Sequence, residues 1–140
     1  MSNFYKYFKE NMDGLGLPAP ESLYGTLQTT LVNAGIFVGH IDKFGKAVTV
    51  ADVVGAGTKL EQLGIIGTLS ASYYAGAVLG SLAVATGRNI SGGVSISDVL
   101  LTANRYGLSR QWLAPTLHQS PSLCDPRVKY KVLCFHKIPR

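Results

Sequence analysis

Two long stretches of the chain lack charged side chains, and their apolar residues recur at helical spacing. The first covers residues 22–41 and follows Pro20 and Glu21, which suit a first helical turn. Its apolar positions alternate at intervals of three and four: Tyr24, Leu27, Leu31, Ala34, Val38 and Ile41. This spacing predicts one helix of about 20 residues, in which Gly35 and Gly39 form a pair of small residues four apart beside the apolar stripe.

The second stretch, residues 63–87, is 25 residues long and rich in Gly, Ala, Ser and Thr. One row of positions in steps of four contains only small residues, and a neighbouring row begins with Gly67 and Ala71. The first row is Gly64, Thr68, Ser72, Gly76 and Gly80. Because residues four apart stack on one side of a helix, the pattern predicts a single helix over 63–87 with a groove of small residues.

Such a groove favours the association of helices inside lipid. Hydrophobicity cannot drive helices together in a bilayer, whereas small residues let two backbones approach closely. In water, each interior glycine costs about 0.5 to 1 kcal/mol relative to alanine. The first helix, of about 20 residues, would span about 30 Å, and the second, of 25 residues, would span about 37 Å. The hydrocarbon core of a bilayer is about 30 Å thick. Residues 20–90 are therefore predicted to form a hydrophobic hairpin that can enter a membrane, joined through a charged connection at 42–61.

Polar residues dilute both stretches, among them Gln28 and Asn33 in the first and Ser70 and Tyr74 in the second. Polar residues at mid-membrane depth face a bundle interior or a water-filled path. The dilution indicates a protein that is water-soluble when made and inserts later. Two alternatives stay open: a Gly/Ala-rich helical core of a soluble binding or effector domain without membrane activity, and a permanently embedded small membrane protein.

Shorter elements are predicted on either side of the hairpin. An amphipathic helix over 3–12 and a Gly/Pro-rich linker occupy residues 1–19, and Thr49 with Asp52 resembles the start of a short helix. Ser97 is expected to cap a helix that Gly107 ends.

The last part of the chain is predicted to be less regular. Ser109 is expected to start a helix that stops before Pro115, and residues 115–126 are expected to be irregular. Apolar residues at period two over 128–134 predict a strand.

Composition limits the class of protein. A chain of 140 residues fits one domain, and its 15% charged residues fall below the usual content of about 25%. The predicted fold is mainly α: a compact helical bundle around a central pair of long uncharged helices, with an irregular or short-β C-terminal segment. Residues 1–14 contain no apolar run followed by a cleavage site, so no cleavable secretion signal is expected.

The net charge of +5 belongs to the C-terminal segment, residues 91–140. Residues 105–140 carry seven Lys or Arg and one acid, whereas residues 1–104 carry six Lys or Arg and seven acids. A basic tail attracts phosphates, and aromatic residues near cations suit a membrane interface. Trp112, Lys129 and Lys131 are therefore candidate membrane-surface residues. A solvated basic face is the simpler interpretation, and nucleic acid is the least favoured partner.

The paired uncharged helices, the small residues at four-residue spacing and the size of the chain resemble the small pore-forming toxins that bacteria deliver by type VI secretion. The resemblance covers about residues 20–90 and depends on the row from Gly64 to Gly80 and on Gly35 and Gly39. It implies passage on a secretion-tube protein as carrier, insertion into the inner membrane of a target bacterium, oligomerisation and loss of membrane potential. It also implies a cognate immunity protein that protects the producing cell.

Other chemistry finds less support in the sequence. Cys124, Cys134, His118 and His136 are zinc-ligand types, but their spacing fits no closed zinc loop. A catalytic pair of Cys134 with His136 is the enzyme alternative, although nothing marks this cysteine as activated. No enzyme activity, cofactor or metal is therefore expected.

Overall fold

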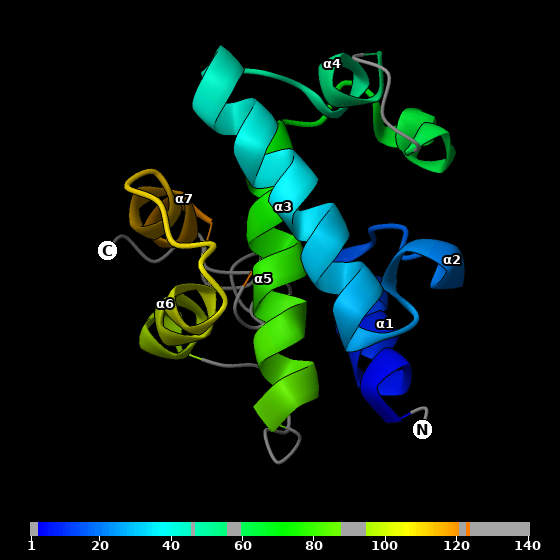
Figure 1. The fold of residues 1–140 in the computed structure, drawn as a ribbon, viewed down its shortest axis with the longest axis vertical. Coiled ribbons are helices and arrows are strands. Elements are labelled where there is room, and N and C mark those ends of the chain that lie inside the picture. Colours follow the sequence, from blue (N-terminus) through cyan, green and yellow to red (C-terminus); the bar gives the residue numbers. More distant parts are fainter. Residues whose placement is uncertain (1–2, 46, 56–59, 88–94, 121–122, 124–140) are drawn as a thin grey trace, which may run out of the picture.

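The computed structural model describes residues 3–45, 47–55, 60–87, 95–120 and 123, and these are mainly helical (Figure 1). The elements in chain order are α1 (Asn3–Leu15), α2 (Glu21–Tyr24), α3 (Leu27–Phe44), α4 (Val50–Gly55), the 3-10 helix η1 (Glu61–Ile66), α5 (Ala71–Gly87), α6 (Ile96–Arg105) and α7 (Leu113–Gln119). The predicted mainly α class is confirmed. The strand predicted over 128–134 lies outside the described residues.

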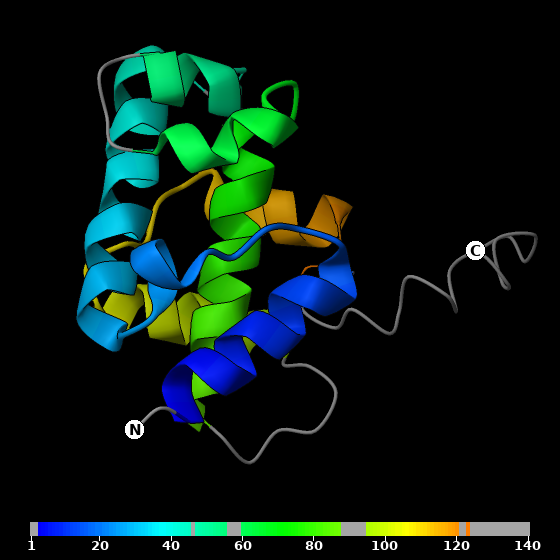
Figure 2. The same cartoon turned by 90° about the vertical axis from the view of Figure 1, so that its right-hand side faces the viewer.

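Helix α5 is the centre of the arrangement. It lies between α3 on one side and α6 and α7 on the other, and α1 packs across it from a third direction (Figures 1 and 2). Short helix α4 also contacts it. The two uncharged stretches therefore do pack together, through α3 and α5, but other helices surround the second one.

The first uncharged stretch forms two helices, so the prediction of one continuous helix is wrong. Gly25 follows α2 at a tight approach, where an added Cβ would lie 2.6 Å from the Glu21 carbonyl oxygen. Thr26 is extended, with φ −132° and ψ 163°, and its hydroxyl accepts a hydrogen bond from the Thr29 amide at 3.1 Å. The hydroxyl of Thr29 in turn accepts from the Thr26 amide at 3.2 Å. This reciprocal cap starts a new helix and overrides the apolar periodicity that continues across it.

The second predicted helix, over 63–87, is also wrong at its N-terminal end. Residues 63–70 form the rest of η1 and a turn, and an antiparallel bridge joins Thr49 to Ser70. The Val50 amide donates to the Leu69 carbonyl at 2.8 Å, and the Ala71 amide donates to the Val48 carbonyl at 2.9 Å. These backbone groups bond to a distant segment, so the α-helix begins only at Ala71, where its own ladder becomes available.

Helix ends elsewhere follow local capping chemistry. Thr49 and Asp52 cap α4 reciprocally, with amide-to-side-chain distances of 2.9 and 3.2 Å, as predicted. Gly107, with φ +74°, follows the end of α6 as predicted. The N-cap of α6 is Ser95 rather than Ser97: the Ser95 hydroxyl accepts from the Asp98 amide at 3.1 Å.

Pro115 does not end a helix. It lies in the first turn of α7, where backbone N–H groups have no intrahelical partner, so its missing N–H costs nothing there. Residues 115–119 are consequently helical rather than irregular, and no helix begins at Ser109.

A column of aromatic rings joins the helices on the α1 side of α5. Successive ring centroids from Phe4 to Phe8, Tyr24, Tyr74 and Phe37 are 5.8, 5.0, 6.5 and 5.2 Å apart. Such separations are typical of favourable aromatic pairs. The column links α1, α2, α5 and α3, and the Tyr74 hydroxyl donates to the Pro18 carbonyl at 2.8 Å.

Candidate functional site

The candidate site is α5 itself, because this helix has no solvated face. Fourteen of its 17 residues are buried, and residues 74–85 are buried without interruption. A surface helix of a globular protein buries only an apolar stripe, whereas a helix that is apolar all round belongs in a core or a membrane. The helix contains no charged residue. In this structure α5 is covered by α1, α3, α4, α6 and α7, together with Leu123.

Gly76 and Gly80 form the part of the predicted groove that lies on α5, and other residues of the chain occupy it. A Cβ at position 76 would lie 3.0 Å from the Leu123 Cδ1, 3.6 Å from the Thr116 Cγ2 and 3.8 Å from Leu117. A Cβ at position 80 would lie 2.5 Å from the Leu123 carbonyl oxygen. These two glycines thus let α7 and the Leu123 backbone approach α5 closely.

The remaining members of the predicted row are not all on this helix. Ser72 lies in the first turn of α5, is buried, and shares a hydrogen bond of 2.9 Å with the Ser70 hydroxyl. Gly64 belongs to η1, and Gly67 and Thr68 lie in the turn after it. The continuous groove in this structure is therefore shorter than predicted, because the bridge between Thr49 and Ser70 stops the helix before these residues.

Gly35 and Gly39 face outward from α3. A Cβ added at either position would have no other atom within 4 Å, and Gly39 is exposed. The same side of the helix presents Val32, which is 59% exposed. A shallow hollow begins nearby and is lined by Leu27, Gln28, Leu31 and Val32. This second pair of small residues therefore packs against nothing in the described part of the chain.

The candidate membrane-surface residues are only partly described. Trp112 is buried, and its indole N–H has no hydrogen-bond partner within the described part of the chain. In this form of the protein it therefore offers little surface to a bilayer. Lys129 and Lys131 lie outside the described residues, as do Cys124, Cys134 and His136.

His118 is exposed near the end of α7. Among the described residues, no group of three or more His, Cys, Asp or Glu side chains is placed to hold a metal ion. Across the same residues, no helix is both long enough and apolar enough to cross a membrane.

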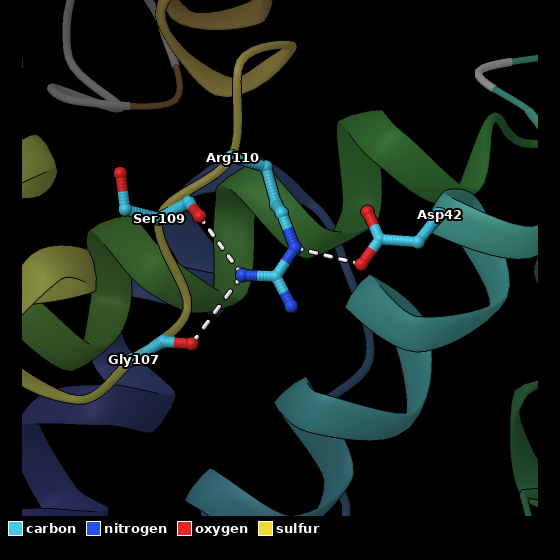
Figure 3. Close-up of polar contacts among 4 residues, drawn as sticks. All are labelled: Asp42, Gly107, Ser109 and Arg110. Carbon is cyan, nitrogen blue, oxygen red and sulfur yellow. Dashed lines mark hydrogen bonds and ion pairs between the residues drawn. The ribbon is translucent and has the colours of Figure 1, made fainter.

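An ion pair joins α3 to the loop between α6 and α7. The Arg110 Nε donates to the Asp42 carboxylate at 2.7 Å, and its guanidinium also donates to the carbonyls of Gly107 and Ser109 at 3.4 and 2.8 Å (Figure 3). The side chains are 34% and 42% exposed. The pair connects α3 with the loop before α7, which lie on two sides of α5 (Figure 3). It lies at the surface, where ion pairs contribute little to stability.

A buried polar contact holds α1 against α5. The Asn11 side-chain amide donates to the Ser81 hydroxyl at 2.9 Å, and both residues are buried. A hydroxyl left without a partner in an apolar interior is costly, so this bond matters to the position of α1. The contact spans 70 positions in sequence, and no local pattern pointed to it.

Burial shifts the pKa of the two central tyrosines. It raises the pKa of Tyr24 well above its usual value, and it also raises the pKa of Tyr74. Burial disfavours the phenolate, so both hydroxyls stay protonated in the folded protein at pH values where they ionise in the unfolded chain.

The free energy of unfolding is therefore expected to fall as the pH rises above about 10, the usual tyrosine pKa. The unfolded chain then loses protons that the folded chain keeps, and the slope approaches about 1.4 kcal/mol per pH unit for each tyrosine. Urea unfolding at pH 9, 10 and 11 measures it. Tyr24→Phe keeps the ring and removes one titrating group, so its slope should be shallower than that of the wild type. Equal slopes would contradict this explanation.

Comparison with protein-family models, with curated proteins and with solved structures found no match to this chain.

Proposed function

We propose that the protein is an antibacterial toxin that enters the inner membrane of a target bacterium and forms ion-conducting pores as an oligomer of helical hairpins. The observation that carries the proposal is that α5 is uncharged and buried on every side, so that the other helices act as its sheath in water. The remaining parts of the proposal are a secretion-tube protein as carrier and a cognate immunity protein.

The free-energy cost of uncovering α5 is high in water and low in lipid. Its side chains cannot be exposed to water without losing the benefit of burial. Lipid tails are as apolar as the side chains that now cover α5, so exchanging one cover for the other costs those side chains little. Residues 63–70, which precede α5, contain no charged side chain, so α5 could extend through them on insertion without placing a charge in lipid.

The hydroxyl groups on α5 determine which hydrogen bonds the inserted form must make. The Thr86 hydroxyl already donates to the Leu82 carbonyl of its own helix at 2.9 Å, so it needs no new partner in lipid. Ser81 depends on Asn11 of α1 and would need another partner if α1 moved away. In an oligomer, Ser72 and Ser81 could then bond across helices or line a water-filled path.

A soluble helical binding domain is the second candidate, favoured by two large apolar side chains that α3 exposes. Val32 and Phe44 are 59% and 55% exposed there, which suits contact with another protein. This candidate predicts that lipid vesicles keep their contents. The enzyme alternative depends on Cys134 and His136, which lie outside the described residues.

Dye release by the wild-type protein separates these candidates, and Gly39→Leu tests whether α3 packs in a membrane oligomer, because position 39 has open space around it in the folded protein. Folding in water should be unaffected or slightly stabilised, since leucine is the better helix former by about 0.5 to 1 kcal/mol. In a membrane oligomer, leucine would keep helix backbones apart at the pair of small residues. The expected result is that dye release from anionic vesicles falls by about tenfold, equivalent to about 1.4 kcal/mol of lost association.

The matched control is Gln28→Leu, which adds similar apolar bulk to an exposed position of the same helix without filling a glycine. It should leave dye release near the wild-type rate. Absence of release by the wild-type protein from vesicles of any tested composition or pH would refute the proposed function. Equal release by the wild type and by Gly39→Leu would show that α3 is not part of the packing surface of the oligomer.

A further inference from the structure

The groove of small residues on α5 is occupied from within the chain. At Gly80 the occupant is a backbone atom, the Leu123 carbonyl oxygen, which would be 2.5 Å from an added Cβ. At Gly76 the occupants are the side chains of Leu123, Thr116 and Leu117. A second helix could not use these glycines for close backbone contact while α7 and Leu123 remain in place.

The residues that fill the groove adjoin a loop fixed to α3 by one exposed ion pair. Arg110 precedes α7 and binds Asp42 near the end of α3, and the same guanidinium holds the loop carbonyls of Gly107 and Ser109 (Figure 3). Leu113, Leu117 and Leu123 are themselves buried, so the cover contributes to the core in water. The ion pair is half-exposed, and removing such a pair changes an equilibrium by no more than about fivefold.

We propose that α7 and Leu123 form an autoinhibitory cover over the α5 groove, and that the Arg110–Asp42 pair is its latch. The groove becomes available to other copies of the chain only after the cover leaves. This inference rests on the proposed function and adds a form of regulation to it: release of the cover limits the rate of membrane insertion.

Gly80→Ala tests the cover directly. The added methyl group collides with a backbone carbonyl, so the cover must shift, whereas alanine is still small enough for close helix packing in lipid. Hydrogen exchange of residues 113–120 should become at least about tenfold faster, and dye release should accelerate by a similar factor, if the cover's departure limits the rate. Gly35→Ala is the matched control, because the same methyl group meets no atom there.

Arg110→Gln and Asp42→Asn test the latch without touching the core. Each should accelerate dye release, by no more than about fivefold, because a half-exposed ion pair contributes little to the equilibrium. Lys9→Gln removes the exposed pair of Lys9 with Asp13, which lies within α1 at 2.9 Å, and should change nothing. If Gly80→Ala fails to fold, these two latch variants carry the test.

The outcomes separate the inference from the proposed function. Faster exchange together with faster release supports the cover. Faster exchange with unchanged release, from a wild-type protein that does release dye, overturns the cover and leaves the proposed function intact. Unchanged exchange in Gly80→Ala overturns the close contact and the cover with it. Failure of every variant and of the wild type to release dye overturns the proposed function first.

Discussion

Ala77→Asp, Val78→Asp and Leu79→Asp are each expected to destabilise the protein strongly at neutral pH. The three positions follow one another, so their side chains point in directions about 100° apart around α5, and all three are fully buried. An unpaired charge placed in a core costs several kcal/mol, which is comparable with the total stability of about 5 to 15 kcal/mol for a domain of this kind. The expected loss is at least about 3 kcal/mol for each variant.

Urea denaturation followed by circular dichroism measures these losses. The control is Val32→Asp, which places the same charge on the exposed face of α3 and should cost no more than about 0.5 kcal/mol. An ordinary amphipathic helix would tolerate aspartate on its outer side. If any one of the three α5 variants lost less than about 1 kcal/mol, α5 would have a solvated side and the sheath would be incomplete.

Tyr74→Ala is expected to destabilise the protein by about 3 to 5 kcal/mol, the usual range for removing a fully buried aromatic side chain. Tyr74 contacts the rings of Tyr24 and Phe37 and donates to the Pro18 carbonyl, so its removal opens a cavity between α5, α2 and α3. Tyr74→Phe keeps the ring and should cost about 1 to 2 kcal/mol, because the carbonyl then loses its donor.

The neighbouring residue supplies the control for this cavity. Tyr73 lies next to Tyr74 on α5 but is only half-buried, so Tyr73→Ala should cost less than about 2 kcal/mol. Thermal or urea unfolding of the pair compares two identical chemical changes on different sides of the helix. Equal losses in the two variants would contradict the central place of Tyr74 in the aromatic column.

The sequence predicted the class of fold because periodicity and capping are local properties. The amphipathic spacing over 3–12 corresponds to α1, and the side chains of Thr49 and Asp52 cap α4 reciprocally. The length of the second uncharged helix was wrong for a non-local reason. Val48 and Leu69 accept backbone hydrogen bonds across the bridge between their segments, and composition carries no trace of that pairing.

Part of the candidate site could also be predicted from the sequence. The spacing of Gly76 and Gly80 predicted a strip of helix surface without large side chains, because glycine residues are visible in the sequence. Its occupant, Leu123, was not identified, since contact between distant segments depends on the tertiary fold. The Arg110–Asp42 pair spans 68 positions and was missed for the same reason. One pattern of small residues is compatible with packing in water and with packing in lipid, so sequence alone could not choose between them.

The decisive measurement asks whether α5 leaves the protein core for lipid. Trp112 is the only tryptophan, so Trp112→Phe combined with Tyr73→Trp places a single fluorescent reporter on α5 at a half-buried position. If α5 inserts, vesicles of lipid brominated in the acyl chains should quench this indole strongly, whereas matched unbrominated vesicles should not. If the protein binds both kinds of vesicle and its emission is the same in each, α5 has stayed inside the protein and the proposed insertion is wrong.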